Sequence, residues 1–352
     1  MQQPKRILVC PLDWGLGHAT RCIPIIRYLI HKKTEVVIAA AGRPLALLKQ
    51  EFPELEFVQF EGYNIDYSGT LPMALKMAVS VRGILKRIKE EHEELNAIVD
   101  RKHIDIVISD NRYGCHHPKT KNIFITHQLM IKAPVGEGQL HKKVLKYISN
   151  YDECWVPDVA GSRNLSGDLS HKYPLPANTF FIGPLSRFSS AETPAKPIRD
   201  VMAIVSGPEP QRSILEKLIT GQICNKNLSA LIVSGVPDSA GSSKSGGVQV
   251  VTHMNSNEMQ KEMLRSRIII SRPGYSTAMD LSVLAMKAVF IPTPGQTEQQ
   301  YLAEYYKKQN IAFYMDQRNF DLSEALEESV KYNGFELFTA GDYKERIDLL
   351  LK

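Results

Sequence analysis

The chain has 352 residues, of which 43% are hydrophobic, and its formal net charge is +5 at pH 7. This length exceeds one ordinary core and favours two domains, while the composition excludes a largely disordered chain. No run of about 18 uncharged apolar residues occurs, which excludes a membrane-spanning helix. The excess positive charge lies entirely in residues 1–185. A basic half of this kind suits an anionic lipid surface, a phosphorylated acceptor or nucleic acid, or it is an ordinary solvated surface.

The first half alternates short β-branched runs with longer helical patterns. Helices are expected over 19–30 and 72–99. The strands that the pattern predicts are 6–12, 35–40, 56–60, 104–109, 122–126 and 153–156. Because these runs are almost continuously apolar, they indicate a parallel sheet covered by helices on both faces.

The second half repeats this alternation. Its predicted strands are 201–206, 230–234, 248–253, 267–271, 288–292 and 311–315. We therefore expect an α/β protein with two Rossmann-like, doubly wound parallel-sheet domains. A Pro- and Ser-rich linker over 186–200 would separate an N-terminal domain, 1–185, from a C-terminal domain, 201–338. A final helix in 339–352 is expected to pack back on the N-terminal domain.

Three further stretches bear on location and mobility. The polar segment 237–247 predicts an exposed loop between two strands. The first residues lead directly into a strand and show no secretory signal. The five cysteines are scattered through apolar runs, as is typical of buried free thiols in a reducing compartment. We therefore expect a cytoplasmic protein.

Two glycines and a histidine mark the end of the first predicted strand. Gly15, Gly17 and His18 lie where this strand gives way to a helix. In open α/β sheets, ligands bind at the carboxyl ends of strands, and glycine lets the backbone approach them closely. His18 is the candidate general base, with Asp13 in the same loop as the second candidate. The alternative is a tight turn whose histidine packs locally.

A second turn of this kind follows the predicted strand 267–271. Ser271 and Gly274 end the strand, and Ser276 and Thr277 are predicted to cap the next helix. A helix N-terminus after such a turn accepts phosphate. Asp280 lies about one helical turn further, where a carboxylate can accept hydrogen bonds from two vicinal hydroxyls of a ribose.

Three glutamines accompany the next predicted helix start. Gln296, Gln299 and Gln300 follow a Pro/Gly loop, and their amides both donate and accept, which suits sugar hydroxyls. The alternative for both segments is a pair of ordinary helix starts with capping residues.

The order of these residues resembles the donor-site signature of MurG-type glycosyltransferases of family 28. The pattern S-x-x-G-x-x-T-x-x-[DE], a strand ending in proline and a Gln-Gln pair are matched by Ser271, Gly274, Thr277, Asp280, Pro292, Gln299 and Gln300. The Gly-x-Gly-His turn is similar to that family's glycine-rich loop, and the wording GLGHATR is closer to a little-described bacterial branch. The resemblance implies the GT-B fold, in which two Rossmann-like domains face a cleft.

The resemblance also implies roles for individual residues. Asp280 would bind the ribose hydroxyls, and Gln299 and Gln300 would recognise the sugar. The other expected nucleotide-sugar contacts are Gly17, Ser206, Gly207, Arg212, His253, Met254, Asn255, Ser271, Gly274, Ser276, Thr277 and Gln296. Pro208 and Pro210 stand where the family's phosphate loop has small residues, so this loop departs from the family pattern.

The acceptor side is expected at Gly15, Asp110, Tyr113 and His127. Asp110 ends a predicted strand at the crevice edge and Tyr113 follows it, with a structural turn as the alternative. Thr126-His127-Gln128 resembles the His-Glu-Gln element of the family's first domain. The acceptor would be a glycan or a lipid-linked hydroxyl.

The remaining expectations concern partners. The basic amphipathic stretch 72–89 predicts peripheral contact with an anionic membrane at its inner face, and a core helix with a solvated basic face is the alternative. No Asp-x-Asp and no spaced metal-ligand set occurs, so neither a metal nor another cofactor is expected. No nucleic-acid-binding motif occurs, so no nucleic-acid partner is expected.

Together these features predict a metal-independent glycosyltransferase of the hexosyl or N-acetylhexosaminyl type. It would move a sugar, with inversion, from a UDP-linked donor to an acceptor hydroxyl. Two alternatives remain at this point. One is an isomerase similar to UDP-sugar 2-epimerases, which share the GT-B scaffold, and the other is a nucleotide-binding protein without catalysis.

Overall fold

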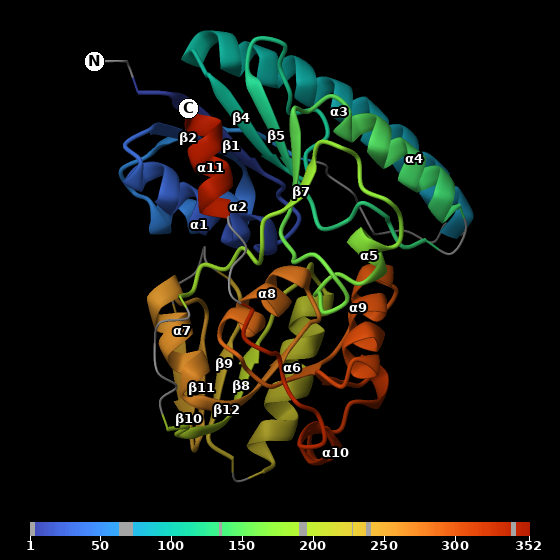
Figure 1. Ribbon diagram of the computed structural model, residues 1–352. Helices are drawn as coiled ribbons and strands as arrows, with labels where there is room; N and C mark the ends of the chain where they lie inside the picture. Colours follow the sequence, from blue (N-terminus) through green and yellow to red (C-terminus); the bar gives the residue numbers. More distant parts are fainter. Residues whose placement is uncertain are drawn as a thin grey trace.

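The computed structural model describes residues 4–62, 73–133, 136–189, 196–226, 228–236, 241–338 and 343–352, with the backbone alone over 73–82. Two α/β domains stand one above the other, each with a central sheet between helices (Figure 1). The prediction of two doubly wound parallel-sheet domains is confirmed.

The N-terminal domain holds a parallel sheet in the order β3-β2-β1-β4-β5-β6-β7. Its strands are β1 (Arg6–Pro11), β2 (Glu35–Ala40), β3 (Glu56–Gln59), β4 (Ile106–Asp110), β5 (Lys121–Ile125), β6 (Glu153–Val156) and β7 (Thr179–Phe181). Its helices are α1 (Gly17–His31), α2 (Gly42–Glu51), α3 (Met73–Lys102), α4 (Glu137–Ile148) and α5 (Asp168–His171).

The C-terminal domain repeats this plan in the order β10-β11-β9-β8-β12-β13-β14. Its strands are β8 (Arg199–Ile204), β9 (Ala230–Val233), β10 (Ser242–Ser245), β11 (Val248–Val251), β12 (Ser266–Ser271), β13 (Ala288–Phe290) and β14 (Phe313–Tyr314). Its helices are α6 (Gln211–Cys224), α7 (Ser256–Leu264), α8 (Tyr275–Val283), α9 (Thr297–Lys308), the short 3-10 helix η1 (Gln317–Asn319) and α10 (Leu322–Ser329). All pairs are parallel except β10–β11.

Strand β1 shows why the strands lack a polar side. Ile7 and Val9 belong to one apolar core with residues of α1, whereas Leu8 and Cys10 belong to a second core with residues of α3. Because side chains alternate along a strand, both faces of the sheet are covered. This explains the continuous apolar runs in the sequence.

The order of the strands places two crevices. The chain winds outward in opposite directions from β1 and β4, and from β8 and β12. Ligands bind at such switch points, beyond the carboxyl ends of the strands. Pro11 pairs with Asp110 and Ser271 with Ile204 at these ends. The loops that carry candidate site residues follow β1, β4, β8 and β12. They therefore lie where this strand order predicts ligand binding.

Two segments differ from the sequence prediction. Strand β7 had no predicted counterpart. The predicted loop 237–247 contains β10, which pairs antiparallel with β11; its residues 237–240 lie outside the described part. All four residues of β10 are exposed and none is apolar, so the alternation that signals a strand is absent.

The helix α11 (Tyr343–Leu351) lies on the N-terminal domain, beside α1 (Figure 1). The Tyr28 hydroxyl donates to Asp348 at 3.0 Å, and Lys32 lies 2.8 Å from the same carboxylate. The chain thus returns to its first domain after completing the second. No helix in the described residues is long and apolar enough to cross a bilayer.

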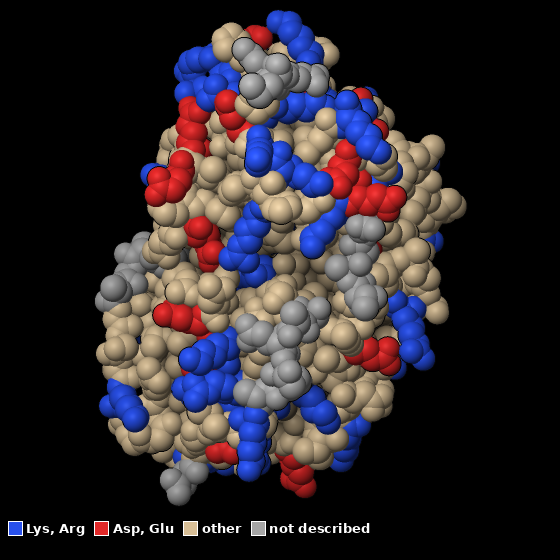
Figure 2. Space-filling model, turned by 60° about the vertical axis from the view of Figure 1, so that its left-hand side comes forward, with Lys and Arg blue, Asp and Glu red and all other residues tan. Residues whose placement is uncertain are grey.

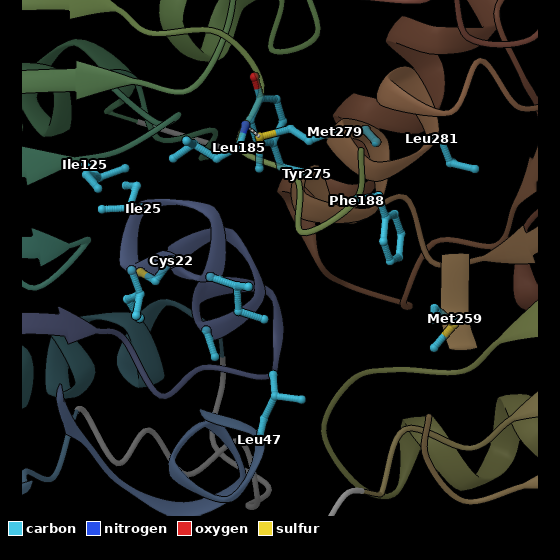
Figure 3. Close-up of a cluster of buried hydrophobic side chains, with 14 of the residues drawn as sticks. Cys22, Ile25, Leu47, Ile125, Leu185, Phe188, Met259, Tyr275, Met279 and Leu281 are labelled. Atoms are coloured by element: carbon cyan, nitrogen blue, oxygen red, sulfur yellow. Dashed lines mark hydrogen bonds between the residues drawn. The ribbon is translucent and has the colours of Figure 1, made fainter. Parts of the chain in front are cut away.

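An apolar cluster continues from one domain into the other. Figure 3 shows Leu185, which follows β7, beside Met279 of α8, and its backbone N–H donates to the Met279 sulfur at 3.3 Å. Tyr275 of α8 and Ile25 of α1 belong to the same cluster. Burial of such apolar surface stabilises the contact between the domains.

Candidate active site between the two domains

His18 lies in the first turn of α1, at the domain interface. After β1 the backbone turns through Gly15, whose φ of 72° favours glycine, and α1 begins at Gly17. Gly17 is required for another reason, because a Cβ there would lie 2.9 Å from the Ser276 hydroxyl of α8. That hydroxyl donates to the Gly17 carbonyl at 2.8 Å. The two predicted glycine turns therefore touch.

Asp110 is buried at the end of β4 and faces His18. Its Oδ1 is 3.2 Å from His18 Nδ1, and its Oδ2 accepts from Arg21 Nε at 2.5 Å. Arg21 Nη2 contacts Oδ1 as well and lies 2.9 Å from His18 Nδ1. Burial alone would raise the pKa of Asp110, but Arg21 and His18 hold it well below its usual value. Asp110 is therefore an anion that orients the histidine.

His127 follows β5 and contacts both domains. Its Nδ1 is 2.9 Å from Arg21 Nη1, and its Nε2 is 2.8 Å from Glu298 Oε1 at the start of α9. The ring stacks on Tyr275, with centroids 4.2 Å apart. Burial lowers the pKa of His127, although Glu298 acts to raise it.

The predicted phosphate-binding turn lies between β12 and α8. The helix begins at Tyr275 with Gly274 as its N-cap, so the expectation that Ser276 and Thr277 cap it is wrong. The Ser276 hydroxyl bonds Gly17 instead. Arg272 is buried beneath the turn and donates to the carbonyls of Ile291 and Pro292 at 2.8 and 3.0 Å. Burial lowers the pKa of Arg272 to about 10.

Asp280, the predicted ribose ligand, lies on α8 and contacts residues 186 and 187, between the two sheets. It is 8% exposed, and its Oδ1 accepts from the Ser186 hydroxyl at 2.6 Å. Arg187 Nε lies 3.7 Å from its other oxygen. Burial raises the pKa of Asp280 to about 6, against the opposing effect of Arg187.

The other predicted donor residues occupy the edges of this region. Ser206 and Gly207 follow β8, and Gly207 has a φ of 114°. Arg212 on α6 pairs with Glu209 and Glu216, each at 2.5 Å, so its charge is already balanced.

The predicted base-binding segment precedes α7. Asn255 is the N-cap of α7 and forms a capping box with Glu258. His253 is half-buried, and burial together with Arg187 lowers its pKa. Met254 packs against the core that continues between the domains.

The three glutamines have different surroundings. Gln299 is buried and accepts from the Thr293 backbone N–H at 2.8 Å, whereas Gln296 and Gln300 are exposed.

The two remaining first-domain candidates have local partners. Asp13 accepts from the Gly62 backbone N–H at 2.9 Å. Tyr113 lies in an aromatic cluster with Phe124 and Tyr147, and burial raises its pKa. Within the described residues, no three His, Cys, Asp or Glu side chains gather as a metal site would require.

The structure thus brings together Gly17, His18, Asp110, His127 and Ser276. Sequence reasoning missed Arg21, Glu298, Ser186 and Arg187. Arg21 had a signal, because it lies three residues after His18 and so shares a helix face with it. Glu298 was visible as a polar residue of the glutamine run. No signal in the sequence indicated Ser186 and Arg187, since they lie in a segment expected to be a linker.

Comparisons with known proteins show what the chain is similar to. Residues 222–339 match the model of the glycosyltransferase family 28 C-terminal domain. An uncharacterized glycosyltransferase of Methanosarcina acetivorans is 24% identical over 322 residues, which cover 84% of this chain and 81% of the relative.

Two solved structures illustrate the likeness in fold. MurG of Acinetobacter baumannii has a TM-score of 0.56 at 13% identity, covering 98% of this chain and 99% of that chain. A glycosyltransferase of Streptomyces sp. SF2575, solved with thymidine diphosphate, has a TM-score of 0.56 at 12% identity and covers 94% of both chains.

Proposed function

We propose that this chain, a MurG-like glycosyltransferase with the GT-B fold and a family 28 C-terminal domain, transfers a sugar from a nucleotide-sugar to an acceptor hydroxyl. The donor is UDP-linked, and the reaction inverts the anomeric carbon. The C-terminal domain holds the donor, and the N-terminal domain supplies the base. The thymidine diphosphate bound by the Streptomyces enzyme is a nucleoside diphosphate of the class that such a reaction releases.

One observation carries this proposal: helices α1 and α8 begin in contact with each other across the domain interface. The Ser276–Gly17 hydrogen bond joins their first turns, and no described side chain caps either N-terminus. Free backbone N–H groups and the helix dipoles therefore converge on one place. Such a place stabilises a diphosphate as it departs with its negative charge.

His18 is the group that takes the proton from the acceptor. Both described contacts of its ring use Nδ1. Asp110 is an anion and only accepts, so we assign the hydrogen to Nδ1, which donates to Asp110. Arg21 Nη2 then donates to Asp110 and lies beside Nδ1 without a hydrogen bond to it. In this tautomer Nε2 is free to accept the acceptor's proton. The acceptor oxygen then attacks the anomeric carbon opposite the diphosphate, the bond to phosphate breaks, and Asp110 stabilises the imidazolium.

The test uses two measurements on the purified chain. Thermal shift with UDP and with dTDP identifies the nucleotide, since ligand at 100 Kd adds about 2.7 kcal/mol of stability. Nucleoside diphosphate release from a nucleotide-sugar, in the presence of glycan and lipid acceptors, measures transfer. His18→Ala should keep UDP affinity within about twofold and lower transfer about 10²- to 10⁴-fold. His31→Ala, at the exposed far end of α1, is the matched control.

Three results would contradict the proposal. Transfer by His18→Ala at the parental rate would remove the histidine as base. An epimerised sugar formed from UDP-N-acetylglucosamine without acceptor would favour the isomerase. UDP binding without turnover on any acceptor would favour the non-catalytic protein.

We also propose that residues 72–89 make peripheral contact with an anionic membrane. This contact would bring the enzyme to a lipid-linked acceptor. The structure describes side chains in this range from residue 83 onward. Lys86 and Lys89 are exposed, with Glu90 and Glu93 at 3.5 and 3.8 Å. On the face that Figure 2 shows, basic and acidic side chains are interspersed. Sedimentation with phosphatidylglycerol vesicles, but not with phosphatidylcholine vesicles, would support the contact.

A further inference from the structure

His127 is held by side chains of both domains. Arg21 of α1 lies at its Nδ1, Glu298 of α9 lies at its Nε2, and Tyr275 of α8 covers its face with the ring planes within 4°. The ring is buried, so its bonds are shielded from water. One imidazole therefore connects the helix that carries His18 to two helices of the C-terminal domain.

The hydrogen on His127 has a defined position. An arginine only donates hydrogen bonds, so Nδ1 accepts from Arg21 and the hydrogen lies on Nε2, which donates to Glu298. A positively charged ring would turn a second N–H toward Arg21. The bond to Arg21 therefore requires the neutral ring. Burial favours the same form, because it lowers the pKa of His127.

Arg21 is shared between His127 and the His18–Asp110 pair. Its Nη1 bonds His127, while Nε and Nη2 hold Asp110 and reach His18. A guanidinium is planar and rigid, so these contacts cannot be set independently. When Glu298 moves with the C-terminal domain, His127 passes that movement to the group that orients the base.

We infer that His127 and Glu298 are positioning residues that couple closure of the C-terminal domain to the alignment of His18. The inference rests on the proposed function, in which His18 is the base. With the domains together, Glu298 holds His127, and His127 holds Arg21 in the plane of the Asp110 carboxylate. With the domains apart, the bond from His127 to Glu298 is lost and Arg21 gains freedom. The base is then aligned only when the donor-binding domain is in place.

Paired substitutions of Glu298 test this inference. Glu298→Gln keeps an oxygen that accepts from His127, whereas Glu298→Ala removes it. Glu298→Ala should lower kcat about tenfold or more, with the Kd for UDP within about twofold, and Glu298→Gln should recover most of the rate. In the double variant His127→Ala with Glu298→Ala, the loss should not exceed the larger single loss, because both act through one contact.

Tyr301→Phe is the matched control. The Tyr301 hydroxyl accepts from the Asp168 backbone N–H at 2.6 Å, so this substitution also removes a hydrogen bond between α9 and the N-terminal domain. It leaves Arg21, His127 and Glu298 in place. Its kcat should stay within about twofold of the parent. An equal loss in Tyr301→Phe and Glu298→Ala would show a general loosening of the interface and would overturn the inference.

Amide hydrogen exchange gives a readout that does not need turnover. In the UDP-bound protein, Glu298→Ala should speed exchange in the first turns of α1 about tenfold, and Tyr301→Phe should not. If Glu298→Ala keeps the parental kcat and the parental exchange rates, the coupling is rejected, even if His18→Ala is inactive. If the parent shows no transfer but its exchange rate in α1 still depends on Glu298, the proposed function is rejected while the mechanical coupling is kept.

Discussion

The hydroxyl of Ser276 and the carbonyl of Gly17 form a hydrogen bond of 2.8 Å between the two domains. The sequence places these residues in two different turns, one in the donor turn and the other beside the candidate base, and expects both to contact the nucleotide-sugar. Their contact brings both turns to one place. It also explains why residue 17 carries no side chain, since a Cβ would lie 2.9 Å from the hydroxyl.

Gly17→Ala should therefore disturb function more than folding. The obstructing atom is the end of a serine side chain, which can rotate away, so the fold loses little stability. The contact between the turns is broken, and transfer should fall about tenfold, as it should in Ser276→Ala. Gly15→Ala should instead lower the stability of the fold. Residue 15 has open space around it, but its φ of 72° predicts a backbone strain of about 1 kcal/mol for alanine. Urea unfolding and a transfer assay check both, and a larger stability loss in Gly17→Ala would contradict this reasoning.

Asp280 should make stability depend on pH. Its pKa is raised to about 6 from an ordinary value of 3.8, so the folded protein favours the protonated form. Its stabilising contribution is present below pH 3.8 and is lost as the pH rises through 6. Asp280→Asn should therefore be more stable than the parent at pH 8, by on the order of 3 kcal/mol, and similar at low pH.

The same substitution should weaken UDP binding, because an amide accepts less strongly from ribose hydroxyls than a carboxylate does. Unfolding at several pH values together with UDP titration measures both effects. A parent and variant that differ equally at pH 4 and pH 8 would show that Asp280 is not strained by burial.

Asp158 should have the opposite pH dependence. Its carboxylate accepts from the backbone N–H groups of Val159, Leu165 and Ser166 at 2.8 to 2.9 Å. Although burial opposes it, His171 and these bonds lower its pKa below the ordinary 3.8. Its contribution is therefore full above pH 3.8 and lost as the pH falls through the lowered value.

Asp158→Asn should cost about 1 to 3 kcal/mol at pH 7, because buried N–H groups lose an ionised acceptor. The loop that it organises contacts α9 through the Tyr306 hydroxyl and the Leu165 carbonyl at 2.9 Å. Exchange of the loop amides should therefore speed up as well. Asp168→Asn, whose carboxylate is 48% exposed and pairs with Lys132, should change stability less. Equal losses in the two variants would contradict the assignment.

The returning helix α11 offers a prediction about packing alone. Ile347 is fully buried in the core that includes α1, whereas Leu349, two residues later, is 47% exposed. Ile347→Ala should destabilise the protein by about 2 to 5 kcal/mol, since it leaves a cavity. Leu349→Ala should cost about 0.5 kcal/mol or less. Chemical unfolding of the two variants measures the difference, which would vanish if α11 did not pack on the N-terminal domain.

The sequence predicts the sheets well because both faces of each sheet are buried. Continuous apolar runs such as 35–40 and 153–156 match β2 and β6 residue for residue. Strand β10 was missed because its exposed residues carry no apolar pattern. Helix α8 begins at Tyr275 with Gly274 as its N-cap, and the hydroxyl of Ser276, the expected cap, bonds the other domain instead. Local capping preferences cannot include such a partner.

The candidate site was predictable to the extent that it lies at strand ends. Asp110 ends β4, and His18 and Ser276 follow β1 and β12, so topology places all three at the two switch points. The bond between His127 and Glu298 depends on how the two domains are oriented, and no spacing within one domain encodes that orientation. For the same reason the sequence did not show that the Ser186 hydroxyl donates a hydrogen bond to the Asp280 carboxylate.

The position of α11 also matters while the protein is being made. A ribosome delivers the chain in order, and domains generally fold as they emerge. The helix that covers α1 leaves the ribosome only after all of β8 to α10. The first domain must therefore wait, with part of its apolar surface uncovered, until the second has emerged. During that interval Tyr28 and its neighbours would be a natural place for a chaperone to bind.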